Sequence, residues 1–400
     1  MAKFDIEVAR SKFPALQHDQ VFFDSAGGSQ TLGGVIDSIR DYLSNTNVQL
    51  GATYKTGKLS TDRYKKGQEA GAKYINAEVD EIVFGSSTTQ LFRNLSFALQ
   101  FSEGDEIIVS GLDHEANISP WVDLAARQKL VLKWWSPAPS PNPQLLASNL
   151  KPLLSARTRL VTCTHTSNIL GTVTDVASIA AAVHTVPGAL LCVDAVAYAP
   201  HRPVDVVALG VDFYAFSWYK VYGPHISMLY GRRGALARVR SLGHFFNPHT
   251  SLENKLGLAG ASYELVQAVP AVVLDYLGAP GAWDAIADRE RELQTVLLDY
   301  LNGRPDVTVY GETSADTALR VPTVSFRVEG WGPRDLVEAV EKDTDFGFRW
   351  GAFYSNRLVT DVLGLDSSEG VVRVSMVHYN TVEEIKSFVE ALDKVLSKKV

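Results

Sequence analysis

A lysine that directly follows an apolar run is the residue in this sequence whose surroundings most favour covalent chemistry. The stretch FYAFSWYKVYGPH (213–225) places Lys220 just after a strand-like run and just before a Gly-Pro turn. Loops at the carboxyl ends of sheet strands build ligand sites. A lysine with its pKa lowered by a partly apolar pocket can hold an aldehyde as a Schiff base. The alternative, an ordinary surface lysine in a turn, is weakened by three aromatic residues within two positions of Lys220.

An aspartate ends another apolar run. Asp194 closes ALLCVDA (189–195), and a carboxylate at the end of an apolar strand is costly unless a cation meets it. The nitrogen of a pyridinium ring would be a natural partner, because a carboxylate keeps that ring protonated and able to absorb electrons. Taken alone, Asp194 is equally well explained as a helix N-cap.

Small hydroxyl residues and a histidine follow two further runs. GSSTTQ (85–90) stands where a strand should end and a helix begin, so Thr88 and Thr89 could cradle an anion, with Ser217 as another donor. Such residues are also common as caps that only stabilise a helix. His114 could lie on a cofactor face, although a lone histidine there is more often structural. Cradle, histidine, aspartate and lysine in this chain order are more specific together than singly.

Short apolar runs alternate with helical patterns between residues 80 and 235, and this alternation predicts the elements that position those residues. The strand candidates are 81–85, 105–110, 130–135, 159–165, 189–195, 212–217 and 226–231. Helical stretches between them include 116–128, 143–154 and 175–186. Near-continuous apolar runs are typical of strands buried on both faces. The alternation therefore predicts an α/β fold with a mainly parallel, doubly wound sheet of seven strands.

The pattern changes after residue 264 to an α+β layout. A helical region (264–302) with a break near 278–281 leads to strands at 307–311 and 323–328, a helix at 333–342, a strand at 371–379 and a final helix from 382. We predict a large domain of residues 16–265 and a small domain of residues 1–15 and 266–400. A cleft between two such domains is where α/β enzymes place ligands.

Composition excludes several other classes of protein. Of the 400 residues, 46% are apolar and 21% charged, the balance of a soluble globular chain rather than a disordered one. A net charge of −7 without a Lys/Arg-dense stretch disfavours a nucleic-acid or anionic-membrane partner. The N-terminal residues are too charged for a signal peptide, and the richest apolar stretch (178–200) is too broken to span a bilayer. We expect a cytoplasmic protein.

The only two cysteines have limited possible roles. Cys163 and Cys192 each lie in a strand-like run, so both should be small buried apolar residues. Their number rules out a disulfide framework or a cysteine-based zinc site, and we predict no metal.

Nearly the whole chain resembles one family, the class V aminotransferases of fold-type I pyridoxal-phosphate (PLP) enzymes, in particular the cysteine desulfurase/selenocysteine lyase branch. The resemblance rests on the order and spacing of five blocks: VFFDSAGG (21–28), DHEANISPW (113–121), HTSNILGTV (165–173), the segment 193–224 and RVSMVHYNTVEEI (373–385). It implies the fold-type I architecture, PLP as cofactor, and a homodimer with active sites near the subunit interface.

The resemblance also implies a role for each matching residue. Lys220 would hold PLP as the internal aldimine and then act as the base, and His114 would stack on the ring as a second catalytic residue. Asp194 would pair with the pyridine nitrogen, and Asn168 would lie near the ring oxygen. Further cofactor contacts would come from Thr88, Thr89, Ser217 and Tyr219. The substrate would be bound by Arg373 and Arg349, as a fork on its carboxylate, and by Ala26 and Tyr354.

The departures from the family pattern carry as much information as the matches. Desulfurases have R-x-G-x-x-C on a mobile loop, but the segment here is RWGAFY (349–354), with Tyr354 at the cysteine position. A phenol cannot replace the thiolate that attacks sulfur, so the usual desulfurase activity is not expected. Ala197 stands where the family has a glutamine, and we expect Tyr198 to fill some of that space. Tyr219 replaces a histidine and could still donate its hydroxyl to phosphate. The second subunit's phosphate donor, expected near 245–250, is not recognisable.

Three hypotheses about function follow. The first is a PLP enzyme acting on an α-amino acid through an external aldimine and a quinonoid, as a lyase, an epimerase or an aminotransferase. The second is decarboxylation or Mannich-type carbon–carbon bond formation in specialised metabolism, because Trp350, Phe353 and Tyr354 would make a large aromatic pocket. The third is a non-catalytic scaffold, which the retained Lys220 and Arg373 argue against. A nicotinamide-dependent dehydrogenase is excluded, because no G-x-G-x-x-G follows a strand.

Overall fold

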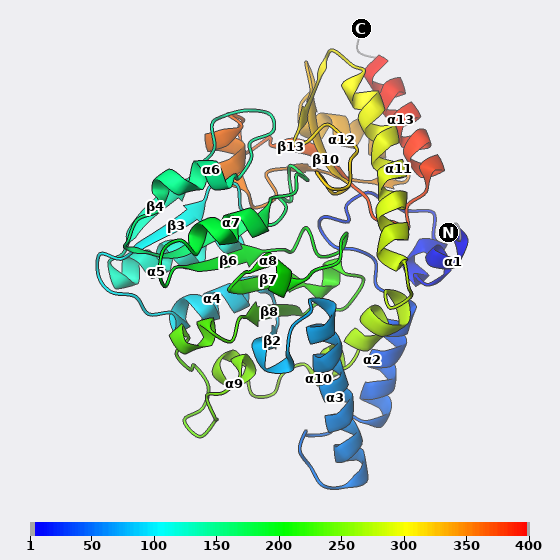
Figure 1. Ribbon diagram of the computed structural model, residues 1–400. Coiled ribbons are helices and arrows are strands. Elements are labelled where there is room, and N and C mark those ends of the chain that lie inside the picture. Colours follow the sequence, from blue (N-terminus) through cyan, green and yellow to red (C-terminus); the bar gives the residue numbers. More distant parts are fainter. Residues whose placement is uncertain (1–4, 398–400) are drawn as a thin grey trace.

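The computed structural model describes residues 5–397 and is built around a seven-stranded sheet (Figure 1). Its strands are β2 (Ile82–Gly85), β3 (Glu106–Ser110), β4 (Val131–Trp135), β5 (Thr158–Thr164), β6 (Leu190–Asp194), β7 (Phe213–Ser217) and β8 (Ser227–Gly231). They lie in the order β2-β8-β7-β6-β5-β3-β4. Strand β8 alone runs opposite to the other six strands and pairs antiparallel with β2 and β7, so the predicted mainly parallel seven-stranded sheet is confirmed.

Alternate residues of the central strands enter two different hydrophobic clusters, one on each face of the sheet. On β7, Tyr214 and Phe216 belong to one cluster and Phe213 and Ala215 to the other. Helices α4 (Thr88–Ala98) and α5 (Ser119–Gln128) pack into the second cluster. The first is packed by α2 (Gly33–Asn45), α3 (Lys55–Tyr74), α6 (Ala147–Leu150), α7 (Val176–Val183) and α8 (Val206–Leu209). Burial of both faces explains why these strands read as continuous apolar runs.

The C-terminal part forms a second, antiparallel sheet. Its strands β9 (Val307–Tyr310), β10 (Thr323–Val328), β12 (Arg349–Gly351) and β13 (Val371–Ser375) lie in the order β12-β13-β10-β9. Three helices, α11 (Ala282–Asn302), α12 (Pro333–Glu341) and α13 (Val382–Ser397), complete a third hydrophobic cluster with this sheet. A short parallel pair, β1 (Val21–Phe22) and β11 (Phe346–Gly347), joins the N-terminal segment to this part. The predicted α+β layout is confirmed.

The sequence prediction overestimated several elements. The helix predicted over 143–154 is only α6 and a 3-10 turn, Lys151–Leu153, because Pro152 cannot continue an α-helix. The region 264–302 divides into α10 (Tyr263–Val266), a π-helical turn Ala271–Tyr276 and α11, with the break near 278–281 as predicted. The strand expected over 371–379 ends at Ser375. Two more short helices are α1 (Ile6–Ser11) and α9 (Leu252–Leu256).

The division of the chain at residues 15/16 and 265/266 stays a prediction. The first hydrophobic cluster runs across both proposed boundaries, with Phe13, Val266 and Leu358 buried in it together. Residues 1–4, which we assigned to the small domain, and residues 398–400 lie outside the described part of the chain. Among the described helices, none has the length and apolar character that a membrane span requires.

Candidate active site

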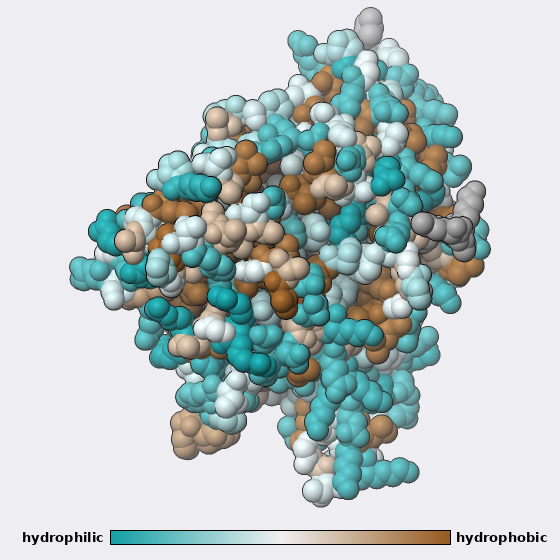
Figure 2. Space-filling view, in the orientation of Figure 1, coloured by the Kyte–Doolittle hydropathy of each residue, from teal (hydrophilic) through white to brown (hydrophobic). Residues whose placement is uncertain are grey.

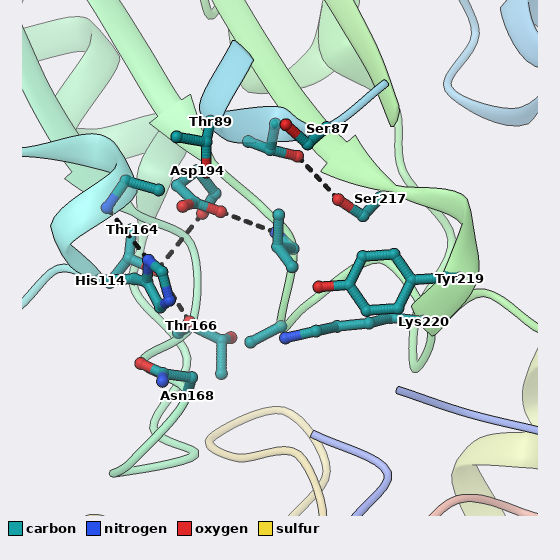
Figure 3. Close-up of a pocket in the computed structure, with 14 residues that line it drawn as sticks. Ser87, Thr89, His114, Thr164, Thr166, Asn168, Asp194, Ser217, Tyr219 and Lys220 are labelled. Atoms are coloured by element: carbon teal, nitrogen blue, oxygen red, sulfur yellow. Dashed lines mark hydrogen bonds between the residues drawn. The ribbon is translucent and has the colours of Figure 1, made fainter. Parts of the chain in front are cut away.

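One cavity opens at the carboxyl ends of the central strands, and all eight predicted cofactor residues line it (Figure 3). Its volume is about 540 Å³ including the open mouth. The eight residues are Thr88, Thr89, His114, Asn168, Asp194, Ser217, Tyr219 and Lys220. They come from five separate strand-to-helix or strand-to-loop junctions, which a doubly wound sheet brings to one edge. The predicted juxtaposition is therefore present, while the role of each residue stays a prediction.

Lys220 stands at the end of the 3-10 turn Trp218–Lys220, which directly follows β7. The side chain is buried, so the surface-lysine interpretation is wrong. Burial, reinforced by the positive charge of Arg373, lowers the pKa of Lys220 to about 8, although Asp194 and Asp24 act in the opposite direction. A buried amine that is readily deprotonated is the form required of a nucleophile toward an aldehyde.

Asp194 ends β6, the strand next to β7, and is buried. Its Oδ1 accepts a hydrogen bond from the backbone N–H of Val196 at 2.9 Å, an Asx-type turn rather than a helix N-cap. Burial raises the pKa of Asp194 to about 6, although that hydrogen bond and Lys220 both lower it. Because burial disfavours the ionised carboxylate, a cation beside Asp194 would stabilise its negative charge, as the sequence predicts.

The cavity is also lined by hydroxyl groups at the N-terminus of α4. Ser87 caps this helix by accepting from Gln90 N–H at 3.1 Å. Thr88 Oγ1 lies 2.8 Å from Ser217 Oγ, which lies 2.6 Å from Ser227 Oγ. The helix N-terminus and these hydroxyls together suit an anion such as phosphate. Sequence reasoning missed Ser227, because only the antiparallel register of β7 and β8 places it opposite Ser217.

His114 is held in one tautomer. Its Nδ1 accepts a hydrogen bond from Ala116 N–H at 3.0 Å, so the proton of the neutral ring is on Nε2. Burial, with Lys220 and Arg373 nearby, lowers the pKa of His114 to about 4. The ring is therefore neutral at physiological pH and can stack or donate through Nε2, but it carries no positive charge.

The two arginines predicted to bind a substrate carboxylate already share a carboxylate of the protein. Arg373 Nη2 lies 2.8 Å from Asp24 Oδ1, and Arg349 Nε lies 2.6 Å from Asp24 Oδ2. Arg373 is buried, whereas half of the Arg349 side chain is exposed. A Cβ atom at Gly27 would lie 2.5 Å from Arg349 Nη2, so a glycine there allows the guanidinium its position. Asp24, whose role was not recognised from the sequence, thus joins the two arginines in an Arg–Asp–Arg cluster, and their binding of a substrate carboxylate stays a prediction.

The segment that replaces the desulfurase cysteine loop differs in part from expectation. Trp350 packs into the third hydrophobic cluster, so the prediction that it widens an aromatic pocket is wrong: the strand pleat of β12 turns it toward that core. The Tyr354 ring lies 5.3 Å from the ring of His114 and its residue is 74% exposed, at the mouth of the site. Phe353 lies against Arg373, with 3.7 Å between the guanidinium carbon and the ring centroid.

Other predicted positions can also be placed. Ala26 is buried and donates its backbone N–H to Ser375 Oγ at 2.9 Å, beside the arginine cluster rather than in the cavity wall. Ala197 lines the cavity, but Tyr198 stacks on His165 at 3.5 Å between ring centroids and is not part of the wall, so it does not fill the space we assigned to it. Cys163 and Cys192 are fully buried in β5 and β6, as predicted.

The donor set of the cavity fits PLP. The hydroxyl cluster matches a phosphate, the buried Asp194 matches a pyridinium nitrogen, and Lys220 matches an aldehyde. Thr166 Oγ1, from another lining residue, is buried and has no hydrogen-bond partner within residues 5–397. A buried hydroxyl of this kind is expected where a polar ligand completes the site.

Comparison with known proteins agrees with this geometry. A family profile described as Aminotransferase class-V matches residues 21–388. The aminotransferase-like protein FGM3 of Gibberella zeae is 56% identical over 400 residues, which is 99% of each chain. The cysteine desulfurase-like protein ustD of Aspergillus flavus is 42% identical over 98% of this chain and 91% of its own. The apo cysteine desulfurase of Thermococcus onnurineus NA1 has the same fold, with a TM-score of 0.89, 24% identity and full coverage of both chains.

Proposed function

This chain belongs to the class V aminotransferase family of PLP-dependent enzymes, and on that premise we propose that it breaks a bond at Cα of an amino-acid substrate without desulfurase chemistry. The observation that carries the proposal is the position of Lys220, which is buried just after β7 and lines the same cavity as Asp194, Thr88 and Ser217. The names of the relatives, aminotransferase-like and desulfurase-like, do not determine which bond at Cα is broken.

Residues of this chain would hold each part of the cofactor. The N-terminus of α4 with Thr88, Thr89, Ser217 and the Tyr219 hydroxyl would bind the phosphate. Asp194 would pair with the ring nitrogen, His114 would stack on the ring, and Asn168 would lie near the ring oxygen. Lys220 Nζ would be the point of covalent attachment. When bound, PLP supplies an electron sink for the electrons of a broken Cα bond.

Lys220 is then the residue to move a proton at Cα. Its pKa of about 8 means that a substantial neutral fraction exists near pH 7 to 8, as a general base requires. His114 is a poor proton donor in this role, because its ring is already neutral and its Nδ1 is occupied. Its contribution would be a flat, uncharged surface beside the reacting atoms.

The arginine cluster would bind the substrate carboxylate. Two guanidinium groups and one carboxylate leave a formal charge of +1, which one substrate carboxylate neutralises. Arg373 is fixed by its buried contacts, and the half-exposed Arg349 has freedom to adjust. Tyr354 at the mouth would contact the side chain of the substrate.

Desulfurase chemistry is disfavoured by the position of both cysteines. Burial raises the pKa of each thiol well above its ordinary value, so neither is a ready thiolate. We therefore expect no persulfide to form on the protein during incubation with L-cysteine. A persulfide trapped on Cys163 or Cys192 would contradict this part of the proposal.

A second candidate, decarboxylation or carbon–carbon bond formation, is favoured by the arginine cluster itself. Asp24 occupies one guanidinium nitrogen of each arginine, so the two do not form an open clamp that would lock a carboxylate in one plane. Release of labelled carbon dioxide from a 1-¹⁴C amino acid identifies this outcome; ammonia, an oxo acid or the mirror-image amino acid identifies the others.

A homodimer is part of the proposal. The loop before α9 projects from the molecule with an apolar tip (Figures 1 and 2), where Phe245 is 95% and Phe246 is 69% exposed. Aromatic side chains exposed to this degree are typical of a contact surface. Sedimentation of the protein before and after Phe245→Ser and Phe246→Ser tests it.

The proposed function is tested by titrating the PLP-loaded enzyme with the twenty amino acids while following the cofactor absorption band, with Lys220→Ala as the reference. We expect at least one amino acid to shift the band and to be turned over by the parent enzyme only. Equal turnover by Lys220→Ala would overturn the proposal.

A further inference from the structure

The four residues 352–355, here called the roof, have an unusual backbone. Phe353 and Tyr354 are consecutive and both lie in the left-handed region, with φ of 48° and 60°. Residues other than glycine rarely adopt this conformation, and it persists only where surrounding contacts impose it. The roof connects β12 of the second sheet to the π-helical turn Leu358–Val362.

Contacts from loops of the large sheet hold the roof. Glu115 N–H donates to Tyr354 O at 2.8 Å, and Asn168 Nδ2 donates to Phe353 O at 2.9 Å. Ser355 Oγ donates to Asn168 Oδ1 at 2.9 Å. Because a backbone carbonyl can only accept, the amide of Asn168 must present its nitrogen to Phe353 and its oxygen to Ser355. The roof therefore fixes both the place and the orientation of this amide.

The roof also contacts Arg373. The guanidinium carbon lies 3.7 Å from the centroid of the Phe353 ring, and Nη1 donates to the backbone oxygen of Asn168 at 3.1 Å. Phe353, Asn168 and Arg373 thus form a closed circuit of three contacts from three different segments. The side chain of Arg373 is buried, a condition in which cation–π contacts are strongest.

We propose that Phe353 and Ser355 are positioning residues: the roof holds Arg373 in the orientation that binds a substrate carboxylate, with Ser355 acting through Asn168. Neither residue is part of the cavity wall that lines the cofactor site. The proposal rests on the carboxylate-binding role proposed for Arg373 above, and it adds which residues hold Arg373 in the orientation for that role. It predicts that discrimination between a carboxylate and a carboxamide depends on two side chains that need not touch the reacting atoms.

The test uses L-alanine and L-alaninamide as probes of the PLP-loaded enzyme, each titrated against the cofactor absorption band. The ratio of the two dissociation constants isolates recognition of the carboxylate. Variants are Ser355→Ala, Phe353→Leu and Arg373→Lys, with Ser96→Ala as matched control. Ser96 is buried like Ser355 and donates one 2.8 Å hydrogen bond, to Arg93 O, on α4.

We expect Ser355→Ala and Phe353→Leu each to reduce the preference for alanine over alaninamide by about 3- to 10-fold, the size of one lost hydrogen bond or cation–π contact. Arg373→Lys should reduce it more, and Ser96→Ala should leave it unchanged. A merely structural defect would weaken both probes equally and would overturn the proposal.

The outcomes separate this proposal from the function beneath it. If Arg373→Lys removes the preference but the two roof variants keep it, the positioning role is wrong and the carboxylate assignment stands. If Arg373→Lys also keeps the preference, or if neither probe shifts the band of the parent enzyme, the assignment of Arg373 fails and the positioning role fails with it. Ser355→Thr, which retains the hydroxyl, should restore the parent ratio.

Discussion

The cofactor site and the neighbouring arginine cluster are built in different ways. At the cofactor site, Asp194 ends β6 and Lys220 lies in the 3-10 turn that follows β7, so the parallel pairing of these two strands brings both residues to the same edge of the sheet. In the arginine cluster, the parts come from distant segments: Asp24 lies more than 300 residues before both Arg349 and Arg373 in the sequence. Ion pairs join the three side chains. The difference suggests that the sheet fixes the cofactor, whereas charged contacts set the geometry of substrate binding.

The largest effect should come from the cofactor site. Asp194→Asn removes the negative charge that would keep the pyridine nitrogen protonated, so we expect turnover to fall about 100- to 1,000-fold, as for other preorganised electrostatic groups. Steady-state kinetics with the best amino acid from the titration measures this. Asp80→Asn, which alters an exposed pair with Arg233, is the control. A fall of less than about threefold in Asp194→Asn would contradict the assignment of this residue.

A smaller effect, mainly on KM, should come from the arginine cluster. Asp24→Asn leaves two guanidinium groups without the carboxylate between them, so each loses its orientation. We expect KM to rise about tenfold with a smaller change in kcat, because the interaction lost is one of substrate binding. If kcat fell alone while KM stayed constant, the two regions would not be separable as described.

The comparison explains what could be predicted from the sequence. The residues at strand ends could be predicted from the sequence, because Lys220, Asp194 and Thr88 each stand at or just after the end of an apolar run. The doubly wound topology then brings such ends together. The place of Ser227 beside Ser217 could not be predicted, since it depends on the register of an antiparallel strand. The role of Asp24 and the contacts of the roof could not be predicted either. The ion pair between Asp24 and Arg373, for example, spans 349 residues and leaves no local pattern in the sequence. The direction in which the Trp350 side chain points could not be predicted, because it depends on the pleat of β12.

Cofactor affinity should show a smaller dependence on the hydroxyl cluster. Ser227→Ala removes one member of the chain of hydroxyls that ends at Thr88, and we expect the dissociation constant for PLP to rise about 3- to 10-fold. Equilibrium dialysis of the cofactor measures it. Ser325→Ala, which also removes a buried hydroxyl, bonded to Ile169 O at 2.7 Å, should leave the constant unchanged. The same loss in both variants would argue against a specific phosphate role.

The smallest effect is a shift along the pH axis. Lys220 has its pKa lowered to about 8, so its neutral, reactive form predominates above that pH and is lost as the pH falls. The rate at which cofactor-free protein takes up PLP should therefore rise with pH through a midpoint near pH 8 and level off above it. Asp24 raises the pKa of Lys220, so Asp24→Asn should move this midpoint downward. A midpoint near 10, as for an exposed lysine, would contradict the buried position.

The most direct measurement concerns the bond between cofactor and protein. The PLP-loaded enzyme is reduced with borohydride, digested, and mapped by mass spectrometry. The account predicts that the reduced cofactor is found on one peptide, attached to the ε-nitrogen of Lys220. Attachment at another lysine, or no attachment while the absorption band persists, would contradict it.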